Sequence, residues 1–198
     1  DMIGQAFTSS QRMVYLISDL LNVSRMKTGK FVIEPADTML SDVTTDEVNQ
    51  LQEALQAKDM KLSYDKPTDF PSMFIDETKI RQVIMNFIDN AIYYTPKGGE
   101  IHLKLWSNRR LMYFTVTDNG IGVPKAEQHN LFAKFYRANN ARQMRPDGTG
   151  LGLFMASKVI TASGGDIIFT SEEGKGSTFG FSLPLKPKPV KTIAKVSK

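Results

Sequence analysis

Two glycine-rich segments contain the residues best suited to bind a ligand. In the first, DNGIGVP at 118–124, Asp118 follows an apolar alternating run and precedes Gly120 and Gly122. A carboxylate can accept a hydrogen bond from an exocyclic amine such as that of adenine, and glycines let the main chain lie against a flat ligand. The same letters are also typical of a plain hairpin turn, so this segment alone leaves both interpretations open.

The second glycine-rich segment, DGTGLGL at 147–153, comes directly before a predicted helix. Backbone N–H groups at the start of a helix are a natural binding site for an anion. The segment is not a Walker A loop, because no Lys-Ser or Lys-Thr pair follows its last glycine. It is not a dinucleotide fingerprint either, because the glycine spacing differs and no parallel strand-turn-helix unit with a ribose-binding acid is evident.

Asn86 and Asn90 are four residues apart on another predicted helix. This spacing points the two amides the same way. An amide oxygen is a suitable hard ligand for a Mg²⁺ ion that is held mostly by phosphates and water. A pair of asparagines that caps nearby backbone is the alternative, and the spacing alone leaves it open.

A long basic segment, residues 123–146, connects the two glycine-rich segments and is called the lid below. Glu127 is its one acid, and its basic residues are Lys125, Lys134, Arg137, Arg142 and Arg145. Loops of this length are usually functional or disordered. A mobile basic segment between two phosphate-facing loops is typical of an active-site lid. We expect Phe132 and Phe135 to anchor it to the core.

The composition is that of a globular protein. The chain has 198 residues, of which 41% are hydrophobic and 23% charged, with no Cys and two His. These values argue against a disordered or fibrous protein. The absence of Cys excludes a disulfide framework and a thiol nucleophile. No apolar run is long enough to span a bilayer.

The net charge of +4 comes from the C-terminal end. Residues 186–198 contain five Lys and no acid, so the charge of residues 1–185 alone is −1. We therefore expect a solvated, disordered basic tail on a nearly neutral body. This distribution argues against a nucleic-acid partner.

The predicted elements give a mixed order. A long helix over residues 5–27, with an apolar stripe and a stop at Gly29, favours a helical bundle, although packing on its own domain stays open. Then come an extended piece at 31–34, a polar helix at 42–57, and a strand at 61–64. A helix capped by Asp76 ends at Thr95-Pro96, strands follow at 101–105 and 111–117, a helix at 149–162, and a hairpin at 167–183. This order predicts an α+β fold, a two-layer α/β sandwich with helices on one face of an antiparallel-rich sheet.

The ordered set of motifs resembles one known family. The Asn-containing helix, DNGIGVP, FAKFYR, DGTGLGL and GKGSTF closely resemble the N, G1, F, G2 and G3 boxes of the sensor histidine kinase ATP-binding domain. That domain has the Bergerat fold of the GHKL superfamily. DLLNVSR at 19–25 resembles the end of the second helix of the dimerisation and histidine-phosphotransfer domain. The resemblance implies a partial second helix at 1–29, a catalytic domain at 30–185 and a basic tail at 186–198.

The resemblance also implies roles for single residues. Asn90 is expected to coordinate Mg²⁺ with Asn86 nearby, and Asp118 to hold the adenine amine. Tyr94 and Thr178 are expected to lie near the adenine. The other residues expected to bind nucleotide are Gly120, Ile121, Gly122, Phe135, Arg137, Gly148, Thr149, Gly150, Leu151, Gly152 and Leu153.

The phosphate contacts differ from the family pattern at one position. Arg137, or a neighbouring lid cation, is expected to touch the phosphates. Tyr93 stands where the family often has Lys or Arg facing them. A phosphate contact from position 93 is therefore not expected, and lid cations are expected to compensate.

The phosphoacceptor of the family is a His followed by Glu. His102 is followed by Leu103 and His129 by Asn130, so neither fits. We expect both to be ordinary surface histidines and the acceptor to lie upstream of Asp1. The chain alone is then not expected to phosphorylate itself.

The function implied by the resemblance is that of a histidine protein kinase. ATP with Mg²⁺ supplies its γ-phosphoryl group to the upstream His, for onward transfer to an Asp in a response-regulator receiver domain. The N-terminal helix is expected to form a homodimer, and the location to be the cytoplasmic portion of a membrane-anchored sensor. The alternatives are another GHKL ATPase that closes a dimer with ATP, and a nucleotide-binding pseudokinase. A transducer domain would favour the first, and a loss of nucleotide binding the second.

Overall fold

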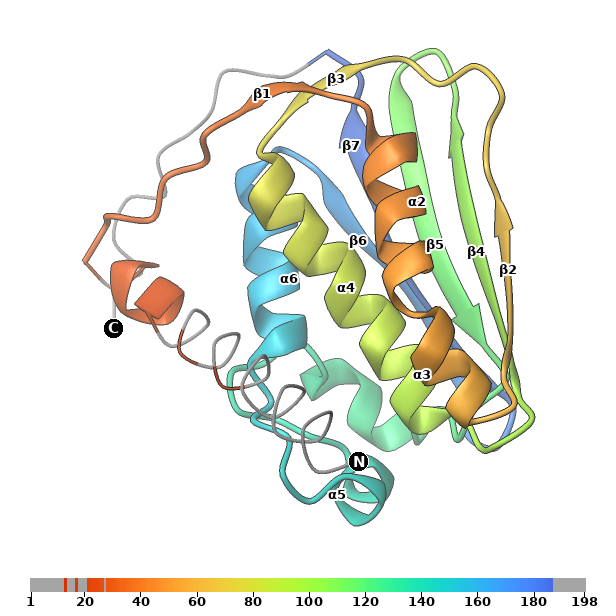
Figure 1. Cartoon of the computed structure of the whole chain (residues 1–198). Coiled ribbons are helices and arrows are strands. Elements are labelled where there is room, and N and C mark those ends of the chain that lie inside the picture. Colours follow the sequence, from red (N-terminus) through yellow and green to blue (C-terminus); the bar gives the residue numbers. More distant parts are fainter. Residues whose placement is uncertain (1–12, 14–16, 18–20, 27, 187–198) are drawn as a thin grey trace. The chain divides into compact units, whose positions relative to one another are not determined.

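The computed structural model describes residues 13, 17, 21–26 and 28–186 (Figure 1). The chain divides into two compact units, with described residues up to Val32 in the first and Ile33 to Lys186 in the second. In the first unit residues 21–26 are helical, and the backbone turns at Gly29, where φ is +69°. Gly29 therefore follows the end of that helix, as predicted. Residues 13 and 17 are helical too, while the other residues expected in the N-terminal helix and the tail from 187 on lie outside the described residues.

A five-stranded sheet forms one layer of the second unit. Its strand order is β2-β4-β5-β7-β6. β2 pairs with β4 in parallel, and the other three neighbouring pairs are antiparallel. The predicted antiparallel-rich sheet is confirmed. The strands are β2 (Lys61–Asp65), β4 (Glu100–Ser107), β5 (Leu111–Asp118), β6 (Asp166–Glu172) and β7 (Gly176–Pro184).

Helices form the other layer. α2 (Leu40–Gln50), α4 (Glu77–Tyr94) and α6 (Gly152–Ala162) cover one face of the sheet (Figure 1). Alternating apolar strand residues and the apolar stripes of these helices meet in the core, where the side chains of Phe87, Phe114 and Phe181 are fully buried. The predicted two-layer α+β sandwich is confirmed. Within the described part of the chain, no helix combines the length and the apolar character needed to cross a membrane.

Helix α4 begins and ends where the sequence predicts. Asp76 is its N-cap, and the side chain accepts a hydrogen bond from Lys79 N at 3.1 Å. The same carboxylate accepts from Glu34 N at 2.9 Å, so the cap also ties down the chain that leads into β1 (Ala36–Thr38). Pro96 prevents the helix from continuing.

Some predicted elements are shifted or divided. The extended piece expected at 31–34 belongs to no strand; the strand β1 follows it at 36–38 and pairs with the unpredicted β3 (Met73–Ile75). Three-residue strands are too short to show an alternation in the sequence. The polar helix expected at 42–57 is two helices, α2 and α3 (Gln52–Ala57), with a break at Leu51.

The helix expected to start at Thr149 also differs. It starts at Gly152, because Gly150 has a φ of +67° and left-handed backbone cannot continue a right-handed helix. The three residues before α6 are therefore loop. The second glycine-rich segment keeps this loop conformation up to Leu151.

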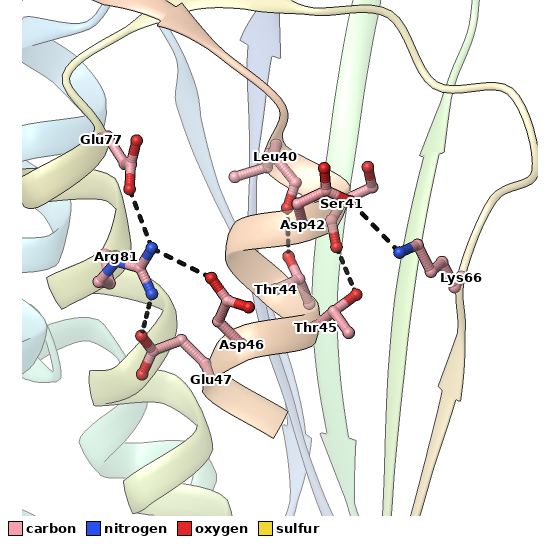
Figure 2. A network of polar contacts seen from close by, with 10 residues as sticks. All are labelled: Leu40, Ser41, Asp42, Thr44, Thr45, Asp46, Glu47, Lys66, Glu77 and Arg81. Atoms are coloured by element: carbon pink, nitrogen blue, oxygen red, sulfur yellow. Dashed lines mark hydrogen bonds and ion pairs between the residues drawn. The ribbon is translucent and has the colours of Figure 1, made fainter. Parts of the chain in front are cut away.

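An ion-pair network connects α2 to α4 (Figure 2). Arg81 Nη1 on α4 lies 2.7 Å from Glu47 Oε1 on α2, and Arg81 Nη2 lies 2.9 Å from Glu77 Oε1 and 3.7 Å from Asp46 Oδ2. The Glu47 side chain is only 1% exposed, and Arg81 is the cation that it contacts. The bonds to Glu77 and Glu47 raise the pKa of Arg81. The pair therefore fixes how α4 sits against α2.

We predict that Arg81→Met destabilises the protein. The substitution leaves the buried Glu47 carboxylate unpaired, which costs about 3 kcal/mol of the free energy of unfolding. Urea denaturation measures this loss, with Arg109→Met in the exposed 108–110 turn as the control. The double variant Arg81→Met/Glu47→Leu should recover most of the stability, and a double variant no more stable than Arg81→Met would contradict the prediction.

Candidate functional site

Asp118 is buried at the end of β5, with only 8% of the residue exposed. Its Oδ1 accepts a hydrogen bond from Gly120 N at 2.8 Å, and the backbone of Ser177 on β7 donates a second. Burial raises the pKa of Asp118, and these two bonds oppose that rise. A carboxylate has capacity for further donors beyond these two. It can therefore accept from an amine of a bound ligand.

The first glycine-rich segment lies between the end of α4 and the β6–β7 turn. Ile121 N donates to the carbonyl of Tyr94, the last residue of α4, at 3.0 Å. A Cβ on Gly120 would collide with that same carbonyl. Gly122 has a φ of +62°, and a Cβ there would collide with the carbonyl of Glu172. The glycines thus let the segment pass between two backbones, and a simple hairpin turn does not require this.

Polar side chains on β6 and in the lid support the same segment. Ser171 Oγ accepts from Val123 N at 2.9 Å, and Gln128 Nε2 donates to the carbonyls of Val123 and Ser171, each at 3.0 Å. The sequence reasoning missed Ser171 and Gln128, because neither belongs to a motif. Thr178, expected near the adenine, has its Oγ1 3.0 Å from Thr117 Oγ1.

The asparagine pair lies against the start of α6. Asn90 Nδ2 donates to Asn86 Oδ1 at 3.0 Å, so Asn90 Oδ1 takes no part in this bond. Gly152 faces Asn86 so closely that a Cβ would collide with its Nδ2. Helix α4 packs on α6 at this point. The structure therefore brings the Asn helix and the second glycine-rich segment together.

The second glycine-rich segment is interlocked with the lid. Phe135 N donates to the carbonyl of Gly150 at 3.0 Å, and a Cβ on Gly150 would collide with the backbone of residues 135 and 136. Leu151 N lies 3.4 Å from Thr149 Oγ1, which is a weak bond. Leu151 is buried and directly precedes α6, whereas Leu153 is half-buried in its first turn.

The lid contains two short helices, η1 (Lys125–Asn130) and α5 (Asn139–Met144). Arg137 ties its second half together. Arg137 Nη1 donates to the carbonyls of Pro146 and Gly148 at 3.1 and 2.9 Å, and Nη2 donates to those of Ala141, at 3.1 Å, and Arg145. Its four terminal N–H groups are thus used within the loop. The expected phosphate contact of Arg137 stays a prediction.

The two lid phenylalanines behave differently. Phe132 packs edge-on against Phe169 of β6, with ring centroids 5.8 Å apart, which fits an anchor. The expectation that Phe135 also anchors the lid is wrong, because Phe135 is 57% exposed. Its φ of +64° bends the backbone toward Gly150, and the ring remains at the surface.

The donor set fits a hard cation held mainly by a ligand. Among the described residues, no cluster of three or more His, Cys, Asp or Glu side chains could hold a metal. Asn90 Oδ1 is a neutral oxygen near the second glycine-rich segment. Mg²⁺ is usually bound by one or two protein oxygens together with phosphates and water. Such an ion would thus depend on a phosphorylated ligand for most of its coordination.

A comparison with known families covers the whole site. Residues 75–187 match the family described as histidine kinase-, DNA gyrase B-, and HSP90-like ATPase. This span is more than half of the chain and contains every residue expected in the site. The chain belongs to this ATPase family. Membership of this family explains why the fold and the ordered motifs occur together in the ATPase domain.

The similar proteins narrow the resemblance within the ATPase family. The adaptive-response sensory kinase SasA of Synechococcus sp. (strain JA-3-3Ab) is 37% identical over 176 residues, which are 88% of this chain and 46% of SasA. The chain thus spans about half the length of that relative. The resemblance of this ATPase domain to that of sensor histidine kinases is confirmed.

Solved structures share the fold of this ATPase domain. Full-length ShkA in complex with AMPPNP superposes with a TM-score of 0.76 at 23% identity, over 93% of this chain and 38% of ShkA. The histidine kinase ThkA, in complex with the response regulator protein TrrA, gives a TM-score of 0.72 at 20% identity, over 91% of this chain and 49% of that one.

We predict that Gly152→Ala moves the Asn86 amide without unfolding the protein. Alanine favours the helix over glycine by up to about 1 kcal/mol, while its Cβ displaces the end of a flexible side chain. The melting temperature should therefore hold or rise, and the Asn86 and Asn90 side-chain amide signals in NMR spectra should shift. Asn86→Ala/Gly152→Ala removes the collision, and its Asn90 signal should match that of Asn86→Ala. Unshifted amide signals in Gly152→Ala would contradict this packing.

Proposed function

We propose that this chain is the ATP-binding catalytic region of a sensor histidine kinase. The observation that carries the proposal is the double contact of α4. Its last residue touches the segment of Asp118, and Asn86, eight residues earlier, touches the second glycine-rich segment. Eight residues of helix cover about 12 Å. This helix therefore runs beside a buried amine acceptor and an anion-binding loop, a spacing suited to a nucleoside triphosphate.

The adenine end lies at Asp118 in this proposal. The carboxylate accepts from the exocyclic amine, and the backbone at Gly120, Ile121 and Gly122 shapes the surface for the ring. Tyr94 and Thr178 lie at the same end. Because a hydrogen bond from the amine favours the charged carboxylate, bound adenine opposes the rise in the pKa of Asp118 that burial causes.

The phosphate end lies at the start of α6. Backbone N–H groups of residues 148–153 face the phosphates, and a lid cation neutralises part of their charge. Asn90 Oδ1 would hold a Mg²⁺ ion that is otherwise bound by the nucleotide and water, and the ion would supply charge neutralisation. Phosphoryl transfer needs mainly positioning and such neutralisation from the protein. This fits a site rich in backbone donors and poor in acids and bases.

The γ-phosphoryl group passes to a His and then to a response-regulator Asp in the intact kinase. The names of the similar proteins support a kinase with such a partner, because SasA is a sensory kinase and ThkA is a histidine kinase in complex with the response regulator protein TrrA. His102 lacks the following Glu of the family's acceptor, and its two ring nitrogens face β2, with Nδ1 2.8 Å from Ser63 Oγ and Nε2 3.4 Å from Asp65 Oδ2. We place the acceptor His outside the present chain, on the dimerisation domain that the N-terminal helix completes. The reaction takes place in the cytoplasm, where ATP is available.

We predict that Asn90→Ala removes the dependence of ATP binding on Mg²⁺. Without the amide oxygen the ion loses its protein ligand, so the variant in Mg²⁺ should bind ATP only as well as the wild-type chain does in EDTA. Isothermal titration calorimetry of both proteins in both buffers measures this. An Asn90→Ala chain whose affinity for ATP still rises on adding Mg²⁺, as the wild type does, would sink the assignment.

We also predict that the chain transfers phosphate to a His on another molecule and not to its own. Incubation with radiolabelled ATP and a separate helical hairpin bearing His-Glu should label the hairpin with acid-labile phosphate. The chain alone should remain unlabelled at His102 and His129, as checked by mass spectrometry at neutral pH. Label on either of these histidines would refute the proposal on the acceptor.

A further inference from the structure

Arg145, at the end of the lid, stacks on Tyr93 of α4. Its guanidinium carbon lies 4.0 Å from the centroid of the Tyr93 ring. The Arg145 side chain is 21% exposed, and its nearest acid is Asp147, at 3.7 Å from Nε to Oδ1. Within the described part of the chain, no hydrogen-bond acceptor serves the buried Nε. The Tyr93 ring thus positions the Arg145 guanidinium, and its Nε–H group has no acceptor among the described residues.

The other lid cations are differently placed. Arg137 uses its four terminal N–H groups on backbone carbonyls of the loop. Lys134 Nζ lies over the exposed Phe135 ring at 4.7 Å, and Lys125 and Arg142 are exposed. Of these five described cations, Arg145 is the one that stacks on a side chain of α4.

The stack lies beside Asn90, the residue proposed to hold Mg²⁺. Tyr93 follows Asn90 by three residues, so the two side chains are neighbours on one face of α4. Arg145 comes two residues before the second glycine-rich segment. Lys58 also lies near the Tyr93 ring, at 5.2 Å, but its Nζ donates to the carbonyl of Ile92 at 2.8 Å. Lys58 therefore caps a carbonyl in the last turn of α4. Of the two cations beside the Tyr93 ring, Arg145 is the one that we expect to bind an anion.

We propose that Tyr93 holds Arg145 in place as the cation that binds the phosphates of ATP. The inference rests on the proposed function. A guanidinium stacked on a ring keeps the N–H groups of its edge available, and their planar fork matches phosphate oxygens. Arg145 contacts the nucleotide, and Tyr93 is a positioning residue. The contact also attaches the end of the lid to the helix that carries Asn90.

The test compares nucleotides that differ in phosphate number. ATP, ADP and AMP are titrated into the 198-residue chain and its variants by calorimetry. Loss of a charged hydrogen bond lowers the affinity by about tenfold or more. Arg145→Ala and Arg145→Gln should lose about tenfold for ATP, less for ADP and almost nothing for AMP. Arg142→Ala, one turn earlier and exposed, is the matched control and should leave all three affinities unchanged.

The role of Tyr93 is tested by coupling. Tyr93→Leu should weaken ATP binding and spare AMP, whereas Tyr93→Phe, which keeps the ring, should retain most of the affinity for ATP. Tyr93→Leu should have no further effect in the Arg145→Ala background, and a thermal melt checks that each variant is folded. Equal losses for ATP and AMP, unchanged ATP binding in folded Arg145→Ala, or additive losses in the double variant would overturn the inference. Failure of the wild-type chain to bind ATP would instead overturn the proposed function.

Discussion

Helix α4 touches backbone at two places where a side chain would not fit. Gly120 packs on the carbonyl of Tyr94, the last residue of the helix. Gly152 packs on the side-chain amide of Asn86, which comes eight residues earlier. These contacts bring two segments that are about thirty residues apart in sequence to the last residue and to the middle of one helix. The distance between Asp118 and the second glycine-rich segment is therefore set by the helix and not by either loop. Everything proposed for the site depends on the position of α4.

The orientation of α4 is fixed by interactions that lie away from the site. An α-helix turns about 100° for each residue, so a small rotation would point Asn90 elsewhere. The apolar stripe sets the rotation coarsely, and two charged contacts refine it. Asp76 ties the first turn to Glu34 N, and Arg81 joins α2 through the buried Glu47. A buried pair of this kind contributes little net stability, but breaking it is costly. The Arg81–Glu47 pair therefore disfavours other packings of α4, because they would separate the two charges.

The sequence was most informative where one residue or one period decides the structure. The Asp76 cap, the end of α4 before Pro96 and the strand at 101–105 each depend on neighbours within a few residues, and each was predicted. The position of Ser171 and the outward turn of Phe135 depend on partners from far along the chain. No local pattern announces such contacts. For the same reason the sequence singled out Tyr93 as a departure from the family pattern, but it could not show that Arg145 lies on the ring.

The lid illustrates how such contacts divide the work among like charges. Its five cations are equivalent in the sequence, yet the fold gives them different environments. Arg137 uses its terminal N–H groups to hold the loop together. Glu127 also braces the loop, because its carboxylate accepts hydrogen bonds from Tyr136 Oη at 3.0 Å and from Asn139 N at 2.9 Å. The contacts that attach this braced lid to the body include Gln128 Nε2 on the Ser171 carbonyl, Phe132 on Phe169, Phe135 N on the Gly150 carbonyl, and Arg145 on Tyr93. The last two of these contacts involve the segment before α6 and a neighbour of Asn90 on α4. A ligand that draws on Arg145 therefore acts directly on one of the attachments of the lid.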